Sequence, residues 1–163
     1  MEARVKLLGH PVHQMLVVFP LGLLGASVVF DLLYWLIDLP VMSEVAYWTM
    51  AGGVLSGLVA APFGFIDWLA IPKGSRARHI GRLHGLGNVV VTLLFGGSWL
   101  LRWQADDHVS LTATALSLGG VAIALVTAWL GGELVSRLGV GVSEQACIDA
   151  PSSLDEPHPT GMQ

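Results

Sequence analysis

Three histidines and one aspartate carry the side chains best suited to chemistry in this sequence. His10 and His13 share one face of a predicted helix, because side chains three positions apart in a helix are neighbours. His84 opens a later apolar segment, and Asp67 lies near the end of the segment before it. Neutral imidazoles and carboxylates are good ligands for zinc, iron, copper or nickel, and two imidazoles on different helices can clamp a haem iron. We therefore predict that these four residues are the ligands of a haem b or a transition metal.

Two further residues are predicted to support these ligands. Asn88 follows His84 by one helical turn, so both side chains share a face, and its amide could fix the tautomer of a ligand imidazole. A carboxylate near the end of an apolar helix must be paired, hydrated or protonated. The expected partner of Asp67 is His13, His84 or Arg82.

The same residues allow a structural interpretation. Histidine pairs three residues apart are common on helices, and no His-Glu-x-x-His motif or cysteine pair accompanies this one. In this alternative the imidazoles are hydrogen-bonded clasps between helices, and Asp67 is a simple ion pair between the second and third apolar segments. We assign no catalytic residue.

Four apolar segments must position these side chains. A helix needs roughly 20 apolar residues to span a bilayer, and residues 14–37, 45–71, 83–103 and 111–131 meet this requirement. The chain is 53% hydrophobic and 12% charged, whereas soluble domains carry about 25% charged residues. Short connections make neighbouring helices antiparallel. The predicted fold is therefore an all-α, integral membrane four-helix bundle with up-down topology.

The distribution of positive charge predicts the orientation of this bundle. The chain has 8 basic residues, and only Arg102 lies outside the ends and the connection that share one side of the membrane. Short loops rich in Lys and Arg stay in the cytoplasm. Both chain ends, and with them His10, His13 and His84, are therefore predicted to be cytoplasmic. The remaining basic residues, all on that side, are Arg4, Lys6, Lys73, Arg76, Arg78, Arg82 and Arg137.

Small residues and one deep carboxylate predict how the helices pack. Gly53, Gly57 and Ala61 recur every four residues and line one face of the second helix. Small residues at this spacing let two helix backbones approach closely, either within the monomer or in a homodimer. Asp31 lies deeper in the first helix and is expected to face the interior, with Thr92, Ser98 or Thr114 as its partner.

Residues 1–142 are predicted to form the transmembrane domain, and residues 143–163 a disordered polar cytoplasmic tail. The tail contains several Ser and Pro residues and lacks the apolar surface needed to fold alone. The single Cys147 excludes a disulfide framework within the chain. No basic run is interleaved with aromatic residues, which argues against nucleic acid as a partner.

Several separated motifs resemble a bacterial family of predicted four-helix inner-membrane proteins, domain of unknown function 2231. The resemblance covers about residues 8–142. It implies the four-helix fold and an inner-membrane location. Members keep a histidine-rich cytoplasmic edge and sometimes occur joined to redox modules, which implies electron transfer or metal handling. The motifs, in order, are Gly9-His10-Pro11-Val12-His13 with Phe19-Pro20, Phe63 to Trp68 with Ile71-Pro72 and Gly74, His84 with Asn88, and Gly132 to Val135 with Gly139 to Val142.

The residues and the resemblance together lead to three functional hypotheses. In the first, the protein holds haem b or a transition metal at the cytoplasmic edge and takes part in membrane electron transfer. In the second, it is a non-catalytic accessory subunit that packs against a larger membrane complex. The third, a transporter or channel component, is the weakest, because one polar cluster at one face does not make a pathway. The lipid bilayer is the expected partner in all three, with a homodimer or a larger redox complex as the protein partner.

Overall fold

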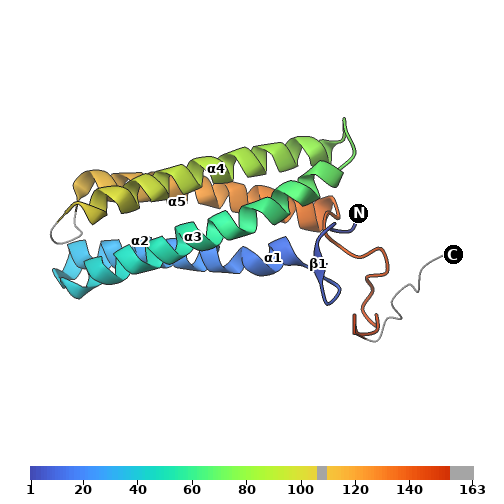
Figure 1. Ribbon diagram of the computed structural model, residues 1–163, viewed down its shortest axis with the longest axis horizontal. Coiled ribbons are helices and arrows are strands. Elements are labelled where there is room, and N and C mark those ends of the chain that lie inside the picture. The colour runs from blue at the N-terminus through green and yellow to red at the C-terminus, as the bar shows by residue number, and fades with distance from the viewer. Residues whose placement is uncertain (106–109, 155–163) are drawn as a thin grey trace.

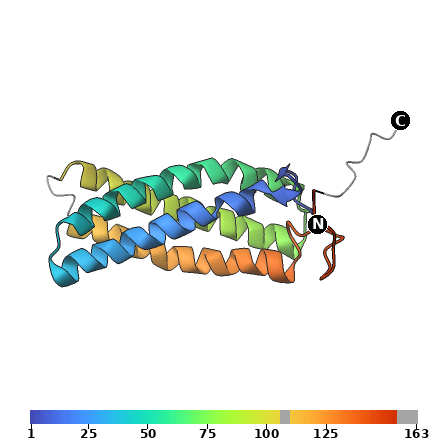
Figure 2. The same cartoon turned by 90° about the horizontal axis from the view of Figure 1, so that it is seen from below.

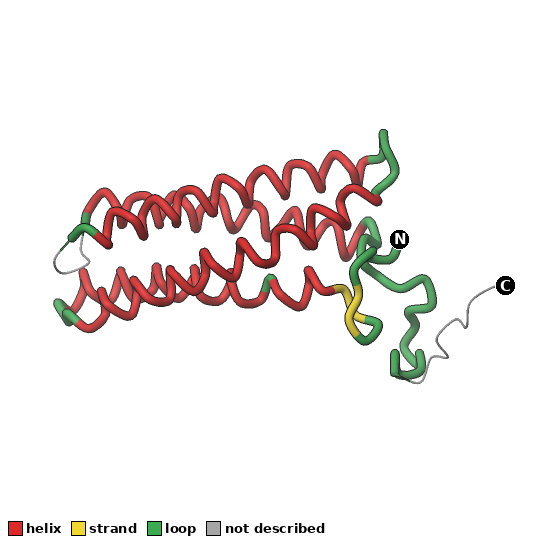
Figure 3. Tube along the Cα trace, viewed as in Figure 1, coloured by secondary structure: helices red, strands yellow, loops and turns green. Residues whose placement is uncertain are grey.

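A computed structural model describes residues 1–105 and 110–154. Its helical elements are α1 (Val12–Leu16), α2 (Val18–Ile37), α3 (Val41–Ala70), α4 (Arg76–Trp103), α5 (Leu111–Gly132) and the π-helix η1 (Glu133–Arg137). Two short strands, β1 (Lys6–Leu7) and β2 (His10–Pro11), precede them and pair antiparallel. Figure 1 and Figure 3 show the helices running along one long axis.

Within the described residues, four helical spans are long and apolar enough to cross a membrane, namely Val12–Ile37, Val41–Ala70, Arg76–Trp103 and Leu111–Arg137. Consecutive spans run antiparallel, so the N-terminal segment and the chain after η1 lie at the same end of the bundle (Figure 1). This arrangement confirms the predicted all-α four-helix up-down fold.

The bundle consists of two helical hairpins. The first hairpin packs α1 and α2 against α3, and the second packs α4 against α5. Figure 2 shows the same bundle from below, with α2 (blue) crossing in front of α4 (yellow-green). Helices α3 and α4 and, less extensively, α2 and α5 join the hairpins. Each hairpin therefore places the start of its first helix beside the end of its second helix.

The core is small and lies at mid-length of the bundle. Its buried members are Leu24, Val28, Met50, Val54, Val91 and Phe95. Many large apolar side chains are exposed instead, such as Leu93 with 68% of its surface accessible and Trp129 with 66%. An apolar exterior is what a bilayer-embedded bundle requires, because lipid replaces water as the solvent.

Helix α3 begins at Val41, four residues before the expected start at Val45. Two further differences from the sequence prediction have local reasons. The first span is interrupted at Val17, because Pro20 has no N–H to donate to the carbonyl of Leu16. Helix α4 begins at Arg76, seven residues before the expected start at Leu83. Its N-cap is Ser75, whose hydroxyl accepts from the N–H of Arg78.

The predicted tail begins beside the bundle. Residues 143–154 form turns, and the Ser153 hydroxyl donates to the carbonyl of Leu8 over 2.9 Å. Residues 155–163, which complete the predicted tail, lie outside the described part of the chain. The disorder assigned to the tail stays a prediction.

Candidate functional site

The His13 imidazole connects α1 to α3. Its Nδ1 lies 3.0 Å from the carbonyl oxygen of Ala60. A carbonyl oxygen can only accept a hydrogen bond, so Nδ1 carries the proton and donates it. The other ring nitrogen, Nε2, is therefore unprotonated in the neutral ring and is available as an acceptor or a metal ligand.

The His84 imidazole connects α4 to α5 in the same way. Its Nδ1 lies 2.9 Å from the carbonyl oxygen of Thr127 and must donate to it. The side-chain amide nitrogen of Asn88 is 3.2 Å from Nε2 of His84. The hydroxyl of Thr127 donates to the Asn88 amide oxygen over 3.1 Å, which orients that amide. Asn88 thus lies beside the candidate ligand nitrogen, as its spacing in the sequence predicts.

A glycine stands against each imidazole. Gly64 follows Ala60 by one helical turn, and a Cβ on Gly64 would lie 2.6 Å from Cε1 of His13. Gly131 follows Thr127 by one turn, and a Cβ there would lie 3.1 Å from Cε1 of His84. A carbonyl inside a helix is normally shielded by the side chain one turn later. Glycine at that position leaves the carbonyl open to a second donor.

The two imidazoles therefore occupy equivalent half-sites at one end of the bundle. Each lies at the start of the first helix of its hairpin and binds a carbonyl near the end of the second helix. Both rings are partly buried. Among the residues predicted from the sequence, the structure brings Asn88 into contact with His84 and places His13 at the same end of the bundle.

Asp67 has a different partner from those expected. Its carboxylate accepts hydrogen bonds from the backbone N–H groups of Arg4 at 2.7 Å and Val5 at 3.4 Å. The N-terminal segment folds back over the end of α3, and its free amides reach Asp67 where the expected side chains do not. The interpretation of Asp67 as a partner of His13, His84 or Arg82 is therefore wrong.

His10 and Arg82 also lie apart from the two half-sites. His10 belongs to β2, is exposed, and has its Nε2 3.3 Å from the Ser153 hydroxyl. Arg82 is exposed, with Nη2 3.5 Å from Nδ1 of His79. Within residues 1–105 and 110–154, no three His, Cys, Asp or Glu side chains form a group that could hold a metal ion.

The predicted packing residues lie in two environments. Gly53 is buried, and a Cβ there would lie 2.6 Å from Cδ2 of Leu24. A Cβ on Gly57 would meet Cβ of Pro20 at 3.6 Å, which is ordinary van der Waals contact. Ala61 is exposed on the bundle surface. Gly53 and Gly57 therefore bring α3 close to α2, whereas Ala61 faces outward.

Sequence reasoning missed a buried ion pair at the other end of the bundle. Nη1 of Arg102 donates to Oδ1 of Asp31 over 2.6 Å, and Nη2 donates to Oδ2 over 2.7 Å. Both residues are buried, with 1% of Arg102 and 3% of Asp31 exposed. Ser117 donates to Asp31, and Arg102 donates to Ser98. Asp31 faces the interior as predicted, but its partners are Arg102 and Ser117 and not Thr92, Ser98 or Thr114. The charge pattern placed Arg102 on the other side of the membrane from the remaining basic residues and gave it no partner.

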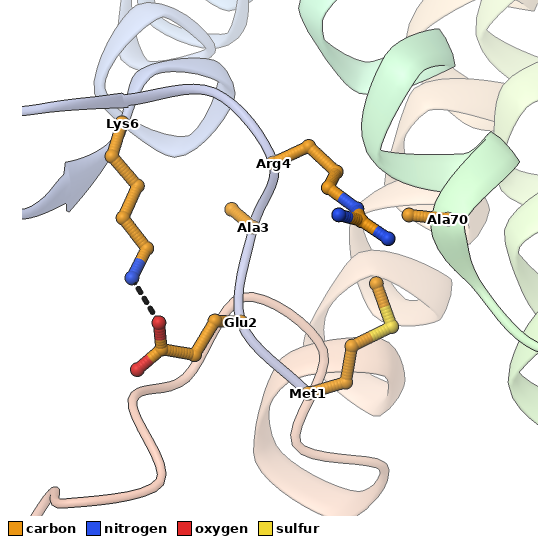
Figure 4. Close-up of a pocket in the computed structure, with 6 residues that line it drawn as sticks. All are labelled: Met1, Glu2, Ala3, Arg4, Lys6 and Ala70. Atoms are coloured by element: carbon orange, nitrogen blue, oxygen red, sulfur yellow. Dashed lines mark hydrogen bonds and ion pairs between the residues drawn. The ribbon is translucent and has the colours of Figure 1, made fainter. Parts of the chain in front are cut away.

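A separate hollow lies where the N-terminal segment meets the end of α3 (Figure 4). Its volume is about 510 Å³. The Lys6 ammonium pairs with the Glu2 carboxylate, and this hydrogen bond lowers the pKa of Glu2 below its usual value. The residues that line the hollow are Met1, Glu2, Ala3, Arg4, Lys6 and Ala70. Neither His13 nor His84 is among them, so this hollow is distinct from the candidate site.

Comparison with known families gives one match for this chain. A family model described as "Predicted membrane protein (DUF2231)" matches residues 9–144. Comparisons with curated proteins and with solved structures give no significant match.

Proposed function

Because the chain belongs to the DUF2231 family of predicted membrane proteins, we propose that this multi-pass membrane protein holds a haem b between His13 and His84. The two half-sites carry the proposal. In each, a backbone carbonyl accepts from Nδ1–H, which leaves Nε2 unprotonated. Ligand histidines are usually oriented by such a bond from the second ring nitrogen.

The donor set favours haem over a bare metal ion. Structural zinc takes four protein ligands, whereas the described residues offer two imidazoles and no group of three ligands. A haem would need only two protein ligands, and His13 and His84 would supply them. When bound, the haem would supply one-electron redox chemistry. His13 and His84 would hold it through Nε2, and the bond from Nδ1 to the Thr127 carbonyl would orient His84. The Asn88 amide nitrogen would then keep its bond to the carbonyl of His84, at 2.9 Å, in place of its contact with Nε2.

The location of the site fits a role in membrane electron transfer. His13 and His84 lie at the end of the bundle that carries the N-terminal segment, which the positive-inside rule places at the cytoplasmic face. We propose the inner membrane of a bacterium as the compartment and a membrane redox complex as the partner.

The test is an optical spectrum of protein purified gently from its native membrane, with haem and metal content measured on the same sample. We expect a Soret band that shifts on reduction and one haem per chain. His13→Ala and His84→Ala should each abolish haem retention. His79→Ala and His10→Ala are the matched controls and should retain the haem, because both residues are exposed and lie away from the half-sites.

A protein without a Soret band and without stoichiometric metal would overturn this proposal. If the purified protein carries one metal ion per chain and no haem, the cofactor at these histidines is a transition metal and not haem b. In the absence of both, His13 and His84 are clasps between helices, and a non-catalytic accessory subunit becomes the better account.

A further inference from the structure

The two hairpins repeat each other position by position. Asp31 and Arg102 are 71 residues apart, and the same shift relates His13 to His84, Leu24 to Phe95 and Ser27 to Ser98. A second constant shift relates α3 to α5. It aligns Ser43 with Ser110, Ala46 with Ala113, Gly52-Gly53-Val54 with Gly119-Gly120-Val121, Leu58-Val59 with Leu125-Val126, and Gly64 with Gly131.

The contacts repeat together with the residue types. Gly53 of α3 faces Leu24 of α2, where a Cβ would lie 2.6 Å from Cδ2. The equivalent Gly120 of α5 faces Phe95 of α4, where a Cβ would lie 2.7 Å from Cε2. The imidazole–carbonyl bonds of the two half-sites are a second repeated contact. Shared spacing and shared contacts together indicate two copies of one structural unit.

The buried ion pair lies where this repeat is broken. Asp31 and Arg102 occupy the same position in the two hairpins, but their charges are opposite. Two copies of the first hairpin in the same arrangement would bring two aspartates together, and two copies of the second would bring two arginines together. Buried like charges cost far more than a hydrogen-bonded pair of opposite charges.

We propose that the hairpins are tandem copies of one unit and that Asp31–Arg102 selects the pairing of unlike hairpins. The partner that fits the interior face of the first hairpin is the second hairpin, and pairing of like hairpins from two chains is excluded by charge. Buried polar pairs have this specifying role at the interfaces of coiled coils, where they fix the choice of partner. This inference does not depend on the presence of haem.

Charge exchange in the full-length protein tests the proposal. Asp31→Arg and Arg102→Asp each create a like-charge pair, and we expect either change to lower the Tm in detergent by about 10 °C or more. The double variant Asp31→Arg/Arg102→Asp restores opposite charges at equivalent positions. It should regain most of the lost Tm and keep the oligomeric state of the wild type.

Co-expression distinguishes selection of partners from simple stabilisation. When differently tagged Asp31→Arg and Arg102→Asp chains are made together, each hairpin finds its opposite charge only on the other chain. We expect mixed complexes in which both tags copurify, at least tenfold above the level of two tagged wild-type chains. A double variant no more stable than the single variants, or mixed complexes at the wild-type level, would overturn the proposal.

Discussion

At the scale of single residues, the site depends on two glycines as much as on the two histidines. A helix carbonyl already accepts the N–H one turn later, and it can accept a second donor only if that donor reaches it. Gly64 and Gly131 leave this space beside the carbonyls of Ala60 and Thr127. The imidazoles fill the space, and their protonation pattern follows from the bond they make there.

Gly64→Ala and Gly131→Ala should therefore displace the imidazoles. A new Cβ on Gly64, at 2.6 Å from the His13 ring, forces the histidine or the helix to move, whereas one on Gly131, at 3.1 Å from the His84 ring, requires a shift of only a few tenths of an ångström and should have the smaller effect. We expect a loss of about 1–3 kcal/mol in the free energy of unfolding and about 10–100-fold weaker retention of a bound cofactor. Thermal unfolding and haem titration measure the two effects.

Gly85→Ala and Gly132→Ala are the controls for this pair. A Cβ at either position meets nothing within 4 Å, so stability and cofactor retention should stay at the wild-type level. Equal losses in all four variants would show that the rings do not depend on the missing side chains.

Asp67→Ala should release the N-terminal segment. The carboxylate holds the backbone amides of Arg4 and Val5, and their loss should cost about 1 kcal/mol. Limited proteolysis should then cut the first residues faster than in the wild type. Asp67→Asn keeps one acceptor oxygen and should show a smaller effect. Loss of a bound cofactor in Asp67→Ala, with the N-terminal segment still protected, would return this residue to the ligand set.

At the scale of elements, the side chain of Arg78 braces the connection between α3 and α4. The guanidinium of Arg78 donates to the carbonyls of Trp68, Leu69 and Ile71 at the end of α3. It also lies 3.9 Å from the centre of the Trp68 ring. The last carbonyls of a helix have no partner inside the helix. Arg78 supplies those partners and turns the chain into α4.

Arg78→Ala should therefore loosen the junction of the two hairpins. Removal of the three hydrogen bonds and the ring contact should lower the free energy of unfolding by about 2 kcal/mol. Arg78→Lys should recover only part of this, because an ammonium cannot reproduce the planar fork of donors. Lys73→Ala is the control, since Lys73 is exposed in the same connection. The account fails if Arg78→Ala and Lys73→Ala unfold alike.

The repeated close contacts within the hairpins give a paired prediction. Gly53→Ala and Gly120→Ala should each destabilise the protein by about 1–3 kcal/mol, because a Cβ would overlap Leu24 or Phe95. Gly96→Ala and Gly119→Ala face open space and should be neutral. Gly57→Ala should also be tolerated at its 3.6 Å contact, while Gly57→Leu should separate α2 from α3. Thermal unfolding in detergent compares these variants, and a stable Gly53→Ala would contradict the packing.

At the scale of the whole molecule, polar groups are gathered at both ends of the bundle. The half-sites of His13 and His84 occupy one end, and the Asp31–Arg102 pair lies towards the other. The buried apolar side chains Met50 and Phe95 belong to the core between them. The architecture therefore separates a candidate cofactor site from the element that pairs the hairpins.

The orientation in the membrane is also a property of the whole molecule. Reporter fusions should read cytoplasmic at Gly74 and after Val142, and periplasmic at Leu39, because seven of the 8 basic residues lie on one side. The burial of Arg102 against Asp31 strengthens this expectation. Arg102 is the one basic residue on the periplasmic side, and its burial means that it is not exposed there. A periplasmic signal at Gly74 would reverse the orientation and move the histidines to the outer face.

The sequence by itself determined the number of spans, their antiparallel order and the contact of Asn88 with His84. These features depend on the length of apolar segments, on short connections and on helical spacing, which are all local properties of the chain. The sequence prediction placed the start of α4 too late, because it relied on the apolar segment alone. A cap at Ser75 allows basic residues to be helical before the apolar segment begins.

Only the tertiary structure decided which side chains meet. Asp67 was expected near the histidines, but the N-terminal segment, which carries no helical or strand signal, folds over it. The sequence did not reveal that Arg102 pairs with Asp31, because Asp31 belongs to the other hairpin and lies 71 residues away. The repeat could have been found by aligning the halves of the chain at that spacing. What the repeat does in the fold depends on contacts between the hairpins. A buried charge is unfavourable unless it is paired, so Asp31 and Arg102 are stable inside the bundle only because they contact each other.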